Sequence, residues 1–303
     1  MAMLLFASLI SVSFSLGGLA APHIDPAAIN AVRFCLAVLV MGVFATLNVR
    51  LERRHLAAPW RYVLMGGLLG LYFVLMFRAL QLTDPVSTGA VFTLTPLMSA
   101  GFGWLFLRQK SPPVVLSSLY LAALGAVWVI FRGDMDAILG FRIGPGEKIF
   151  LIGCAAHAAY TPLVRKFNRG EPVLVFTLWT LVAAFALIAI YGGRAIISTD
   201  WLSLPSIVWI TIAYLAVFTT AITFFLVQYA AMRLPAGKVM AYGYLVPSFV
   251  ILWEGLSGRG WVAPQVWLGV AATIVALVML LRENGGAMPA GGPAVEQAEV
   301  SRQ

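Results

Sequence analysis

Long apolar runs, separated by short polar segments, repeat along the whole chain of 303 residues. A helix needs about 20 predominantly apolar residues to cross a hydrocarbon core about 30 Å thick. Runs of this length predict ten transmembrane helices. The predicted spans are 3–21, 28–47, 61–80, 84–106, 114–131, 146–164, 172–192, 205–230, 235–256 and 263–281.

Two prolines, Pro96 and Pro247, lie deep inside the fourth and ninth predicted spans, 151 residues apart. Proline removes a backbone donor and pushes on the preceding turn, so both helices are expected to kink there. The spacing relates two halves of five spans each. Because five is an odd number, the second half enters the membrane from the opposite side, which predicts an inverted repeat.

The pattern therefore predicts an all-α polytopic membrane protein. Two inverted five-helix repeats, residues 1–135 and 136–283, are expected to enclose a central cavity. The remaining residues, 284–303, are rich in Gly, Ala and Pro, and we interpret them as a disordered cytoplasmic tail. Because no assembly domain is evident outside the spans, we expect a monomer.

Composition supports the bilayer as the solvent of this chain. It is 61% hydrophobic and 11% charged, whereas soluble proteins are roughly 45–50% apolar and about 25% charged. With the N-terminus in the cytoplasm, cytoplasmic segments hold 13 of the 20 Lys and Arg residues and the opposite segments hold five. This asymmetry predicts cytoplasmic N- and C-termini. The net charge of +8 does not indicate a nucleic-acid partner, because no soluble module accompanies the basic segments.

Sequence signatures of enzymes are missing from the chain. It contains no HExxH, GxSxG or phosphate-loop motif, and two of its three histidines fall in loops. We therefore predict no catalytic residues, no metal site and no cofactor.

Small residues inside the spans are interpreted as packing residues. Gly66 and Gly70 form a GxxxG spacing in the third span, which lets helices approach closely in lipid. Cys35 and Cys154 also fall in spans, where they are more typical of packing than of a disulfide or metal pair.

Polar groups inside the spans are the candidates for function, because each costs free energy to place there. His157 lies in the middle of the sixth span, one turn before Tyr160 and Thr161. Its ring can donate a hydrogen bond to a carboxylate or carry a proton; alternatively, a neighbouring helix satisfies it. Gln228, near the cytoplasmic end of the eighth span, either reaches a solute or serves packing.

Three charged side chains in the spans have both a functional and a structural interpretation. Glu254, near the outer end of the ninth span, either couples transport to protons or pairs with Arg259. Arg33 and Arg78 lie within two turns of the outer surface. We expect both to extend towards the interface and to pair with acidic residues in the nearby loops, Asp25 and Asp84.

Side chains around the two prolines predict the walls of the cavity. One wall is formed by Tyr72, Met76, Thr88 and Phe92, and the opposite wall by Tyr242 and Gly243. With His157 and Tyr160, these residues predict an apolar site with scattered hydroxyls and one imidazole. Such a site suits a flat, amphipathic solute. A phosphate would require clustered Lys or Arg, which no span centre contains.

Several short motifs give the chain a resemblance to a known family. They are Arg33-Phe34, Arg78-Ala79-Leu80 followed by Thr83, Thr95-Pro96-Leu97 and Leu105-Phe106-Leu107. On these motifs and the five-plus-five plan, residues 1–283 resemble the EamA-type members of the drug/metabolite transporter superfamily, and most of all the aromatic amino-acid exporters of the YddG type. One departure is that Gln109 and Gly260 stand where this family usually has an acidic residue.

The resemblance implies a ten-helix basket in the bacterial inner membrane that works by alternating access. It implies export of amino acids or similar metabolites from the cytoplasm, with spans one, three, four, six, eight and nine lining the path. We expect large apolar or aromatic amino acids as substrates. Two alternatives remain: export of another metabolite or a drug-like cation with proton coupling through Glu254, and a polytopic membrane enzyme or sensor.

Overall fold

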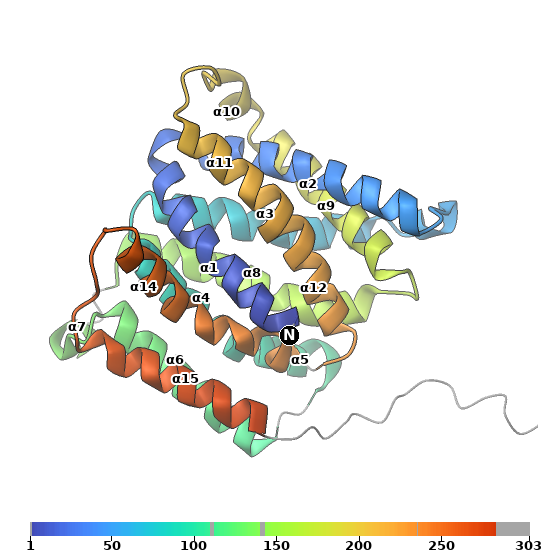
Figure 1. Ribbon diagram of the computed structural model, residues 1–303. Helices are drawn as coiled ribbons and strands as arrows, with labels where there is room; N and C mark the ends of the chain where they lie inside the picture. The colour runs from blue at the N-terminus through green and yellow to red at the C-terminus, as the bar shows by residue number, and fades with distance from the viewer. Residues whose placement is uncertain (1, 110–111, 140–142, 235, 283–303) are drawn as a thin grey trace, which may run out of the picture.

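The computed structural model describes residues 2–109, 112–139, 143–234 and 236–282, which form helices joined by short loops (Figure 1). This part of the chain contains no strand. Its helices are α1 (Ala2–Ala20), α2 (Pro26–Asn48), α3 (Trp60–Leu80), α4 (Pro85–Phe92), α5 (Thr95–Leu107), α6 (Pro113–Ile130), α7 (Met135–Leu139), α8 (Pro145–Phe167), α9 (Val173–Tyr191), α10 (Gly193–Ser198), α11 (Ser206–Tyr214), α12 (Thr223–Ala231), α13 (Ala236–Ala241), α14 (Val246–Leu256) and α15 (Val266–Arg282). The predicted tail, 284–303, lies outside the described residues.

Short irregular elements connect some of these helices. A π-helical segment, Leu215–Ile222, joins α11 to α12 without a break. Single 3₁₀ turns occur at Ala21–His23, Arg53–Leu56 and Tyr242–Leu245. The last of these turns separates α13 from α14.

Eight segments in the described part of the chain are long and apolar enough to cross a membrane. By length and composition, they agree with the predicted spans one to five and seven to nine. At the position of the sixth span, α8 carries charged residues in its first and last turns and is more polar than the others. At the position of the tenth, the apolar stretch Val266–Leu280 is shorter than a typical span. For these two helices the membrane-spanning role stays a prediction.

Two helices, α2 and α4, each begin at an Asp-Pro dipeptide. Asp25 precedes Pro26 at the start of α2, and its carboxylate accepts a hydrogen bond of 2.7 Å from the backbone N–H of Ala27. Asp84 precedes Pro85 at the start of α4 and accepts one of 2.8 Å from Ser87. An acidic cap satisfies N–H groups that the first turn leaves free, and proline fits the first helical position. Both carboxylates therefore serve to begin helices.

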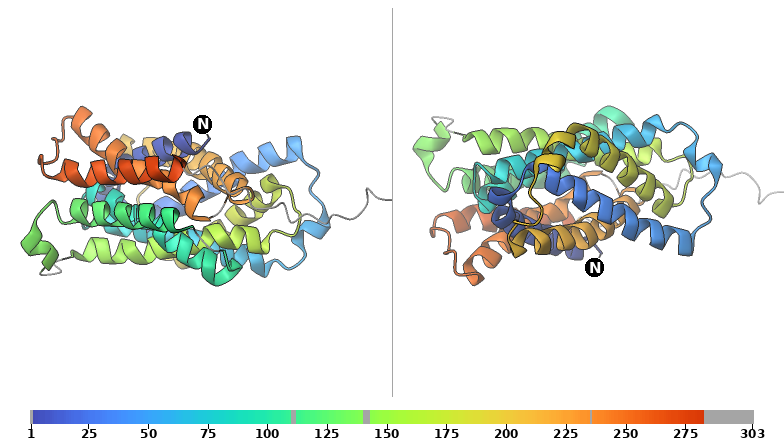
Figure 2. Two further views of the ribbon diagram at one scale, coloured as in Figure 1. Left: turned by 90° about the horizontal axis from the view of Figure 1, so that it is seen from below. Right: turned by 90° about the horizontal axis from the view of Figure 1, so that it is seen from above.

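Connecting loops gather at two opposite ends of the helix bundle. At one end, Arg132 forms an ion pair with Asp84, and Trp128 donates a hydrogen bond to the carbonyl of Gln265. At the other end, Arg61 pairs with Glu171. Figure 2 shows the loop before α3 at the end opposite to α7. Successive helices thus run back and forth between the two ends.

The outward faces of the peripheral helices are apolar. Exposed large side chains on α2, α6 and α15 include Leu39, Val43, Leu47, Leu116, Tyr120, Leu124, Leu268 and Val275. Water-soluble proteins rarely expose continuous apolar surfaces of this kind, whereas a lipid bilayer solvates them. The chain is therefore a multi-pass membrane protein whose polar groups are concentrated inside the bundle and at its two ends.

Glycines set the closest helix contacts. A methyl group at Gly66 of α3 would lie only 2.5 Å from the backbone nitrogen of Ala184 in α9. Likewise, a methyl group at Gly125 of α6 would lie 2.7 Å from the carbonyl oxygen of Gly269 in α15, and one at Gly269 would lie 2.5 Å from that of Gly125. Such close approach of backbones is how apolar helices associate in lipid.

Candidate functional site

Aromatic side chains from five helices meet at the centre of the bundle. α8 contributes the histidine and a tyrosine that the sequence singled out, together with Phe150, and α1, α3, α4 and α12 contribute the rest. We call this group the central aromatic cluster, which consists of Phe14, Tyr72, Phe73, Phe92, Phe150, His157, Tyr160 and Phe224. All are at most 4% exposed.

The position of the cluster follows from the close packing of α8 on α3. A methyl group at Gly153 of α8 would lie 3.3 Å from the carbonyl oxygen of Tyr72, so only a very small residue fits against the backbone of α3. His157 lies one helical turn after Gly153 and faces the same helix. As a result, the rings of His157 and Tyr72 stack, with their centroids 4.5 Å apart and their planes 23° apart.

His157 touches rings on several sides. Its ring centroid lies 5.7 Å from that of Phe92 and 6.2 Å from that of Phe224, which is nearly perpendicular to it. The side chain is 1% exposed, and neither ring nitrogen has a hydrogen-bond partner among the described residues. Buried polar atoms are normally paired, because an unpaired one loses its hydrogen bonds to water without replacement. Among the described residues, the unpaired imidazole is therefore a candidate for contact with a solute.

The hydroxyl of Tyr160 is held by a polar chain that links three helices. The amide nitrogen of Gln228 on α12 donates a hydrogen bond of 2.6 Å to this hydroxyl. In turn, Thr177 on α9 donates one of 2.8 Å to the amide oxygen of Gln228. All three side chains are buried. Gln228 therefore positions Tyr160.

The remaining cavity residues predicted from sequence lie around the cluster with different surroundings. Gly243 lies against Phe92, since a methyl group there would be 3.0 Å from the edge of that ring. Met76 is fully buried in the same hydrophobic core, and the half-buried Tyr242 packs against that core. Thr88 is buried too, but its hydroxyl bonds to carbonyls of its own helix, those of Asp84 and Pro85.

Both predicted spans that contain the deep prolines are interrupted just before them. α4 ends at Phe92, and α5 resumes at Thr95, with Pro96 in its first turn. In the other half, the 3₁₀ turn Tyr242–Leu245 precedes α14, which carries Pro247 in its first turn. Because proline cannot donate to the preceding turn, the helical pattern stops and restarts. The interruptions place Phe92 and Gly243 beside each other at the cluster.

Five residues at this centre were not assigned to it from sequence. Four of them, Phe14, Phe73, Phe150 and Phe224, belong to the ring cluster. Their types are common in membrane helices, but Phe150 precedes His157 by seven residues and could have been found from that two-turn spacing. Arg33 was expected to extend towards the outer interface, and this expectation is wrong. Its side chain is fully buried, and Asp25 caps α2 instead of pairing with it.

Glu254 lies apart from the cluster and is paired. One guanidinium nitrogen of Arg259 lies 2.9 and 3.0 Å from its two carboxylate oxygens. The carboxylate is 12% exposed, so the pair occupies the edge of the bundle. This pairing agrees with the structural interpretation predicted from the sequence, in which Glu254 pairs with Arg259.

Removing the charge of Glu254 separates the two substrate classes. E254Q is expected to keep the rate of amino-acid transport within about two- to threefold of wild type, because Glu254 lies apart from the central aromatic cluster and pairs with the partly exposed Arg259. A proton-coupled cation route through this carboxylate would be abolished. Initial rates of both solute types in proteoliposomes, with and without a pH gradient, measure the difference.

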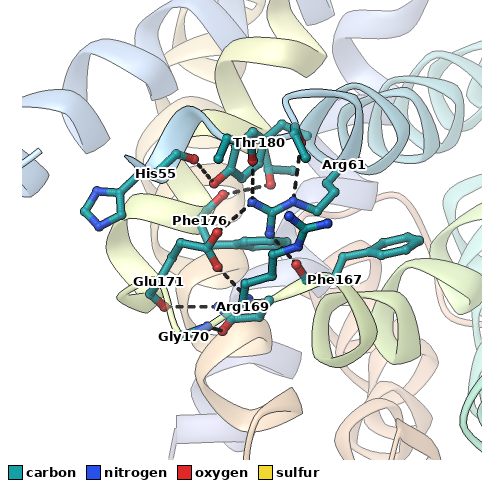
Figure 3. Close-up of polar contacts among 12 residues, drawn as sticks. His55, Arg61, Phe167, Arg169, Gly170, Glu171, Phe176 and Thr180 are labelled. Atoms are coloured by element: carbon teal, nitrogen blue, oxygen red, sulfur yellow. Dashed lines mark hydrogen bonds and ion pairs between the residues drawn. The ribbon is translucent and has the colours of Figure 1, made fainter. Parts of the chain in front are cut away.

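A second ion pair lies at the C-terminal end of α8, at the end of the bundle opposite to α7. Arg61 of α3 is 1% exposed and lies 2.7 Å from Glu171, in the loop before α9 (Figure 3). The same guanidinium donates hydrogen bonds to the carbonyls of Phe167, the last residue of α8, and of Ala57. These contacts tie the start of α3 to the end of the helix that carries His157.

The pKa of Glu171 reflects this environment. Burial pushes the pKa of this carboxyl upwards, but hydrogen bonds from Arg61 and from the backbone N–H of Arg169 outweigh burial and lower it below its usual 4.5. A group whose folded-state pKa is depressed stabilises the fold above its unfolded pKa, and this contribution is lost as the pH falls through the folded value.

Glu171→Gln should therefore change how stability depends on pH. Near neutral pH, E171Q is expected to lose about 1–3 kcal/mol of unfolding free energy, since the buried Arg61 then lacks a charged acceptor. Below pH 4.5 the difference between variant and wild type should shrink. Melting temperatures of the purified protein in detergent between pH 3.5 and 7.5 measure this. A constant difference over that range would contradict the assignment.

Comparison with known proteins now identifies the family. Two segments of the chain, residues 1–131 and 144–282, match the EamA-like transporter family. The chain belongs to this family. EamA-like proteins are transporters of the drug/metabolite transporter superfamily, so the multi-pass fold is that of a membrane transporter.

One curated protein and one solved structure are similar to this EamA-like transporter. The chain is 25% identical over 248 residues to the uncharacterized transporter YyaM of Bacillus subtilis (strain 168), covering 80% of both proteins. A solved crystal structure superposes with a TM-score of 0.71 at 20% identity, covering 92% of this chain and 95% of the other. The first relative supports a role in transport, and the second supports the fold.

Proposed function

We propose that this EamA-like transporter exports amino acids with large apolar or aromatic side chains. The observation that carries the proposal is the stacking of Tyr72 on His157 inside a cluster of aromatic rings. Flat rings are complementary to an aromatic or broad apolar side chain, through offset stacking and edge contacts. The two unpaired nitrogens of His157 offer hydrogen bonds to the polar end of the same solute.

We propose that the path lies between two inverted five-helix repeats, residues 1–135 and 136–283. The packing supports this, since α2 packs on α9 and α6 on α15, each helix against its counterpart. Contacts between helices that are not counterparts also occur twice, once for each repeat. The packing of α3 on α8 corresponds to that of α11 and α12 on α1, and the packing of α5 on α8 corresponds to that of α14 on α1. The reciprocal contact of Gly125 and Gly269 is what a pseudo-two-fold axis produces.

The location of the cluster supports alternating access as the proposed mechanism. Its rings are closed off from solvent in this conformation, so a solute reaches them only when helices of the two halves separate. Rocking of one repeat against the other exposes the site to one side at a time, and a carrier of this kind needs no cofactor. We propose that it operates as a monomer in a bacterial inner membrane, with both termini in the cytoplasm, as the distribution of Lys and Arg predicts.

Transport by the purified protein tests this function. Proteoliposomes preloaded with unlabelled phenylalanine, tryptophan, leucine, alanine or glutamate are diluted into labelled phenylalanine, and counterflow is followed with and without a pH gradient. We expect phenylalanine, tryptophan and leucine to drive uptake, and alanine and glutamate to drive little. If no amino acid drives uptake in either condition, the substrate class is wrong. Uptake of a labelled aromatic cation alone would favour the cation alternative.

A further inference from the structure

Arg33 is a fully buried cation whose hydrogen bonds go only to neutral groups. Its Nε donates to the hydroxyl of Thr220 at 2.7 Å, and its two terminal nitrogens lie 3.3 Å from the hydroxyl of Thr219 and 3.4 Å from the side-chain oxygen of Asn30. No carboxylate forms an ion pair with it among the described residues. The side chain is 0% exposed.

A charge in this position costs free energy that its present partners do not offset. An isolated charged group at low dielectric loses several kcal/mol of hydration, and neutral hydroxyls recover only part of that. If Arg33 served only to join α2 to the opposite helix, an apolar side chain of similar size would do so at lower cost. The unbalanced charge therefore indicates an anion that is bound at another stage of the cycle.

The helix opposite Arg33 has unusual geometry at the point of contact. Thr219 and Thr220 belong to the π-helical segment Leu215–Ile222, in the middle of a membrane span. Short π-helical insertions are rare and are found frequently at functional sites. This insertion presents two successive hydroxyls to one guanidinium, which fixes its orientation.

Two layers of aromatic rings, Phe73 and then Tyr72 or Phe224, connect Arg33 to His157. The guanidinium lies over the ring of Phe73, with its carbon 3.8 Å from the ring centroid. Phe73 in turn contacts Tyr72 at 4.6 Å and Phe224 at 5.7 Å, measured between ring centroids. Both of these rings contact His157. Phe73, itself a member of the central aromatic cluster, therefore connects the cation to the rings that surround His157.

We propose that Arg33 binds the carboxylate of the transported solute while the central aromatic cluster holds its side chain. Each terminal nitrogen of Arg33 carries two N–H groups but makes one hydrogen bond, so one N–H on each is left for a carboxylate. Paired N–H groups of a guanidinium match the two oxygens of a carboxylate. This assignment rests on the proposed function and adds the group that recognises the acid.

A comparison of solutes with and without a carboxylate tests the assignment. Dissociation constants are measured for phenylalanine, phenylalaninamide and 3-phenylpropionate on wild type, R33Q, R33K and R78Q. The last is a matched control, because Arg78 is exposed and bonds to Gln81 at 2.8 Å. Wild type and R78Q are expected to bind phenylalanine about 10- to 100-fold more tightly than phenylalaninamide, the range of a charge-assisted hydrogen bond.

R33Q is expected to reduce this preference to less than about threefold and to leave the affinity for phenylalaninamide unchanged. R33K keeps the charge, so it should retain part of the preference even if R33Q does not fold. A preference equal to wild type in R33Q, or none in a folded R33K, would overturn the proposal. Binding of 3-phenylpropionate but not phenylalanine, with loss in R33Q, would refute the amino-acid function and still support Arg33 as the carboxylate-binding residue.

Discussion

His157→Ala is expected to lower the transport efficiency for phenylalanine by about 10- to 100-fold, the loss of one ring contact and one buried hydrogen bond. Its imidazole stacks on Tyr72 and carries the two unpaired nitrogens of the cluster. Tyr72→Ala should have a similar effect, because it removes the other half of the stack. Initial rates of uptake at several phenylalanine concentrations, in proteoliposomes, provide the measurement.

Two conservative variants separate a role in the site from a role in folding. His23→Ala replaces an exposed histidine in a loop and should transport as wild type does. Tyr72→Phe keeps the ring and loses only the hydroxyl, so it should retain most of the activity. If H157A and Y72A both transported phenylalanine at the wild-type rate, the central aromatic cluster would not be the binding site, although the fold would stand.

Gly66→Ala is expected to destabilise the protein, because it adds a methyl group where α3 packs against the backbone of α9. The new Cβ would lie 2.5 Å from the backbone nitrogen of Ala184 and 2.8 Å from the carbonyl carbon of Ala183. Neither is a side-chain atom that can rotate away, so α3 and α9 must separate. Overpacking of this kind costs about 1–3 kcal/mol or more. We expect the melting temperature in detergent to fall by about 5–10 °C.

Gly101→Ala supplies the matched control for this prediction. Gly101 lies on α5, and a methyl group there would have no neighbouring atom within 4 Å. Because alanine favours a helix over glycine by about 1 kcal/mol, G101A should melt at or slightly above the wild-type temperature. Equal melting temperatures for G66A and G101A would contradict the close approach of the α3 and α9 backbones at Gly66.

The sequence predicted the parts of this fold that depend on local pattern. Long apolar runs located eight helical segments that are long and apolar enough to cross a membrane, and the family resemblance is confirmed for the EamA-like transporters. His157, Tyr72 and Phe92 were predicted to lie together, and the structure places their rings in contact. Each stands out within an apolar helix as a polar or aromatic group close to mid-span, so the signal is local. Whether these residues bind the solute stays a proposal.

Features that depend on distant contacts were not predictable in the same way. Arg33 bonds to residues 186 and 187 positions further along the chain, and no short-range pattern indicates that pairing. Asp25 looked like its partner from sequence, but the capping of α2 uses that carboxylate. The π-helical segment that presents Thr219 and Thr220 has the same apolar composition as its neighbours, so composition does not reveal it.

Cys154 provides the most direct test of a central site that opens alternately to each side. It is fully buried on α8, one turn before His157, and Cys35 can be replaced by serine to leave it as the only thiol. In C35S proteoliposomes, a small impermeant thiol reagent is added outside or enclosed within, with and without phenylalanine. We predict slow labelling of Cys154 from both sides, and phenylalanine but not glutamate should change its rate. Labelling from one side only, or labelling that no amino acid alters, would contradict the account.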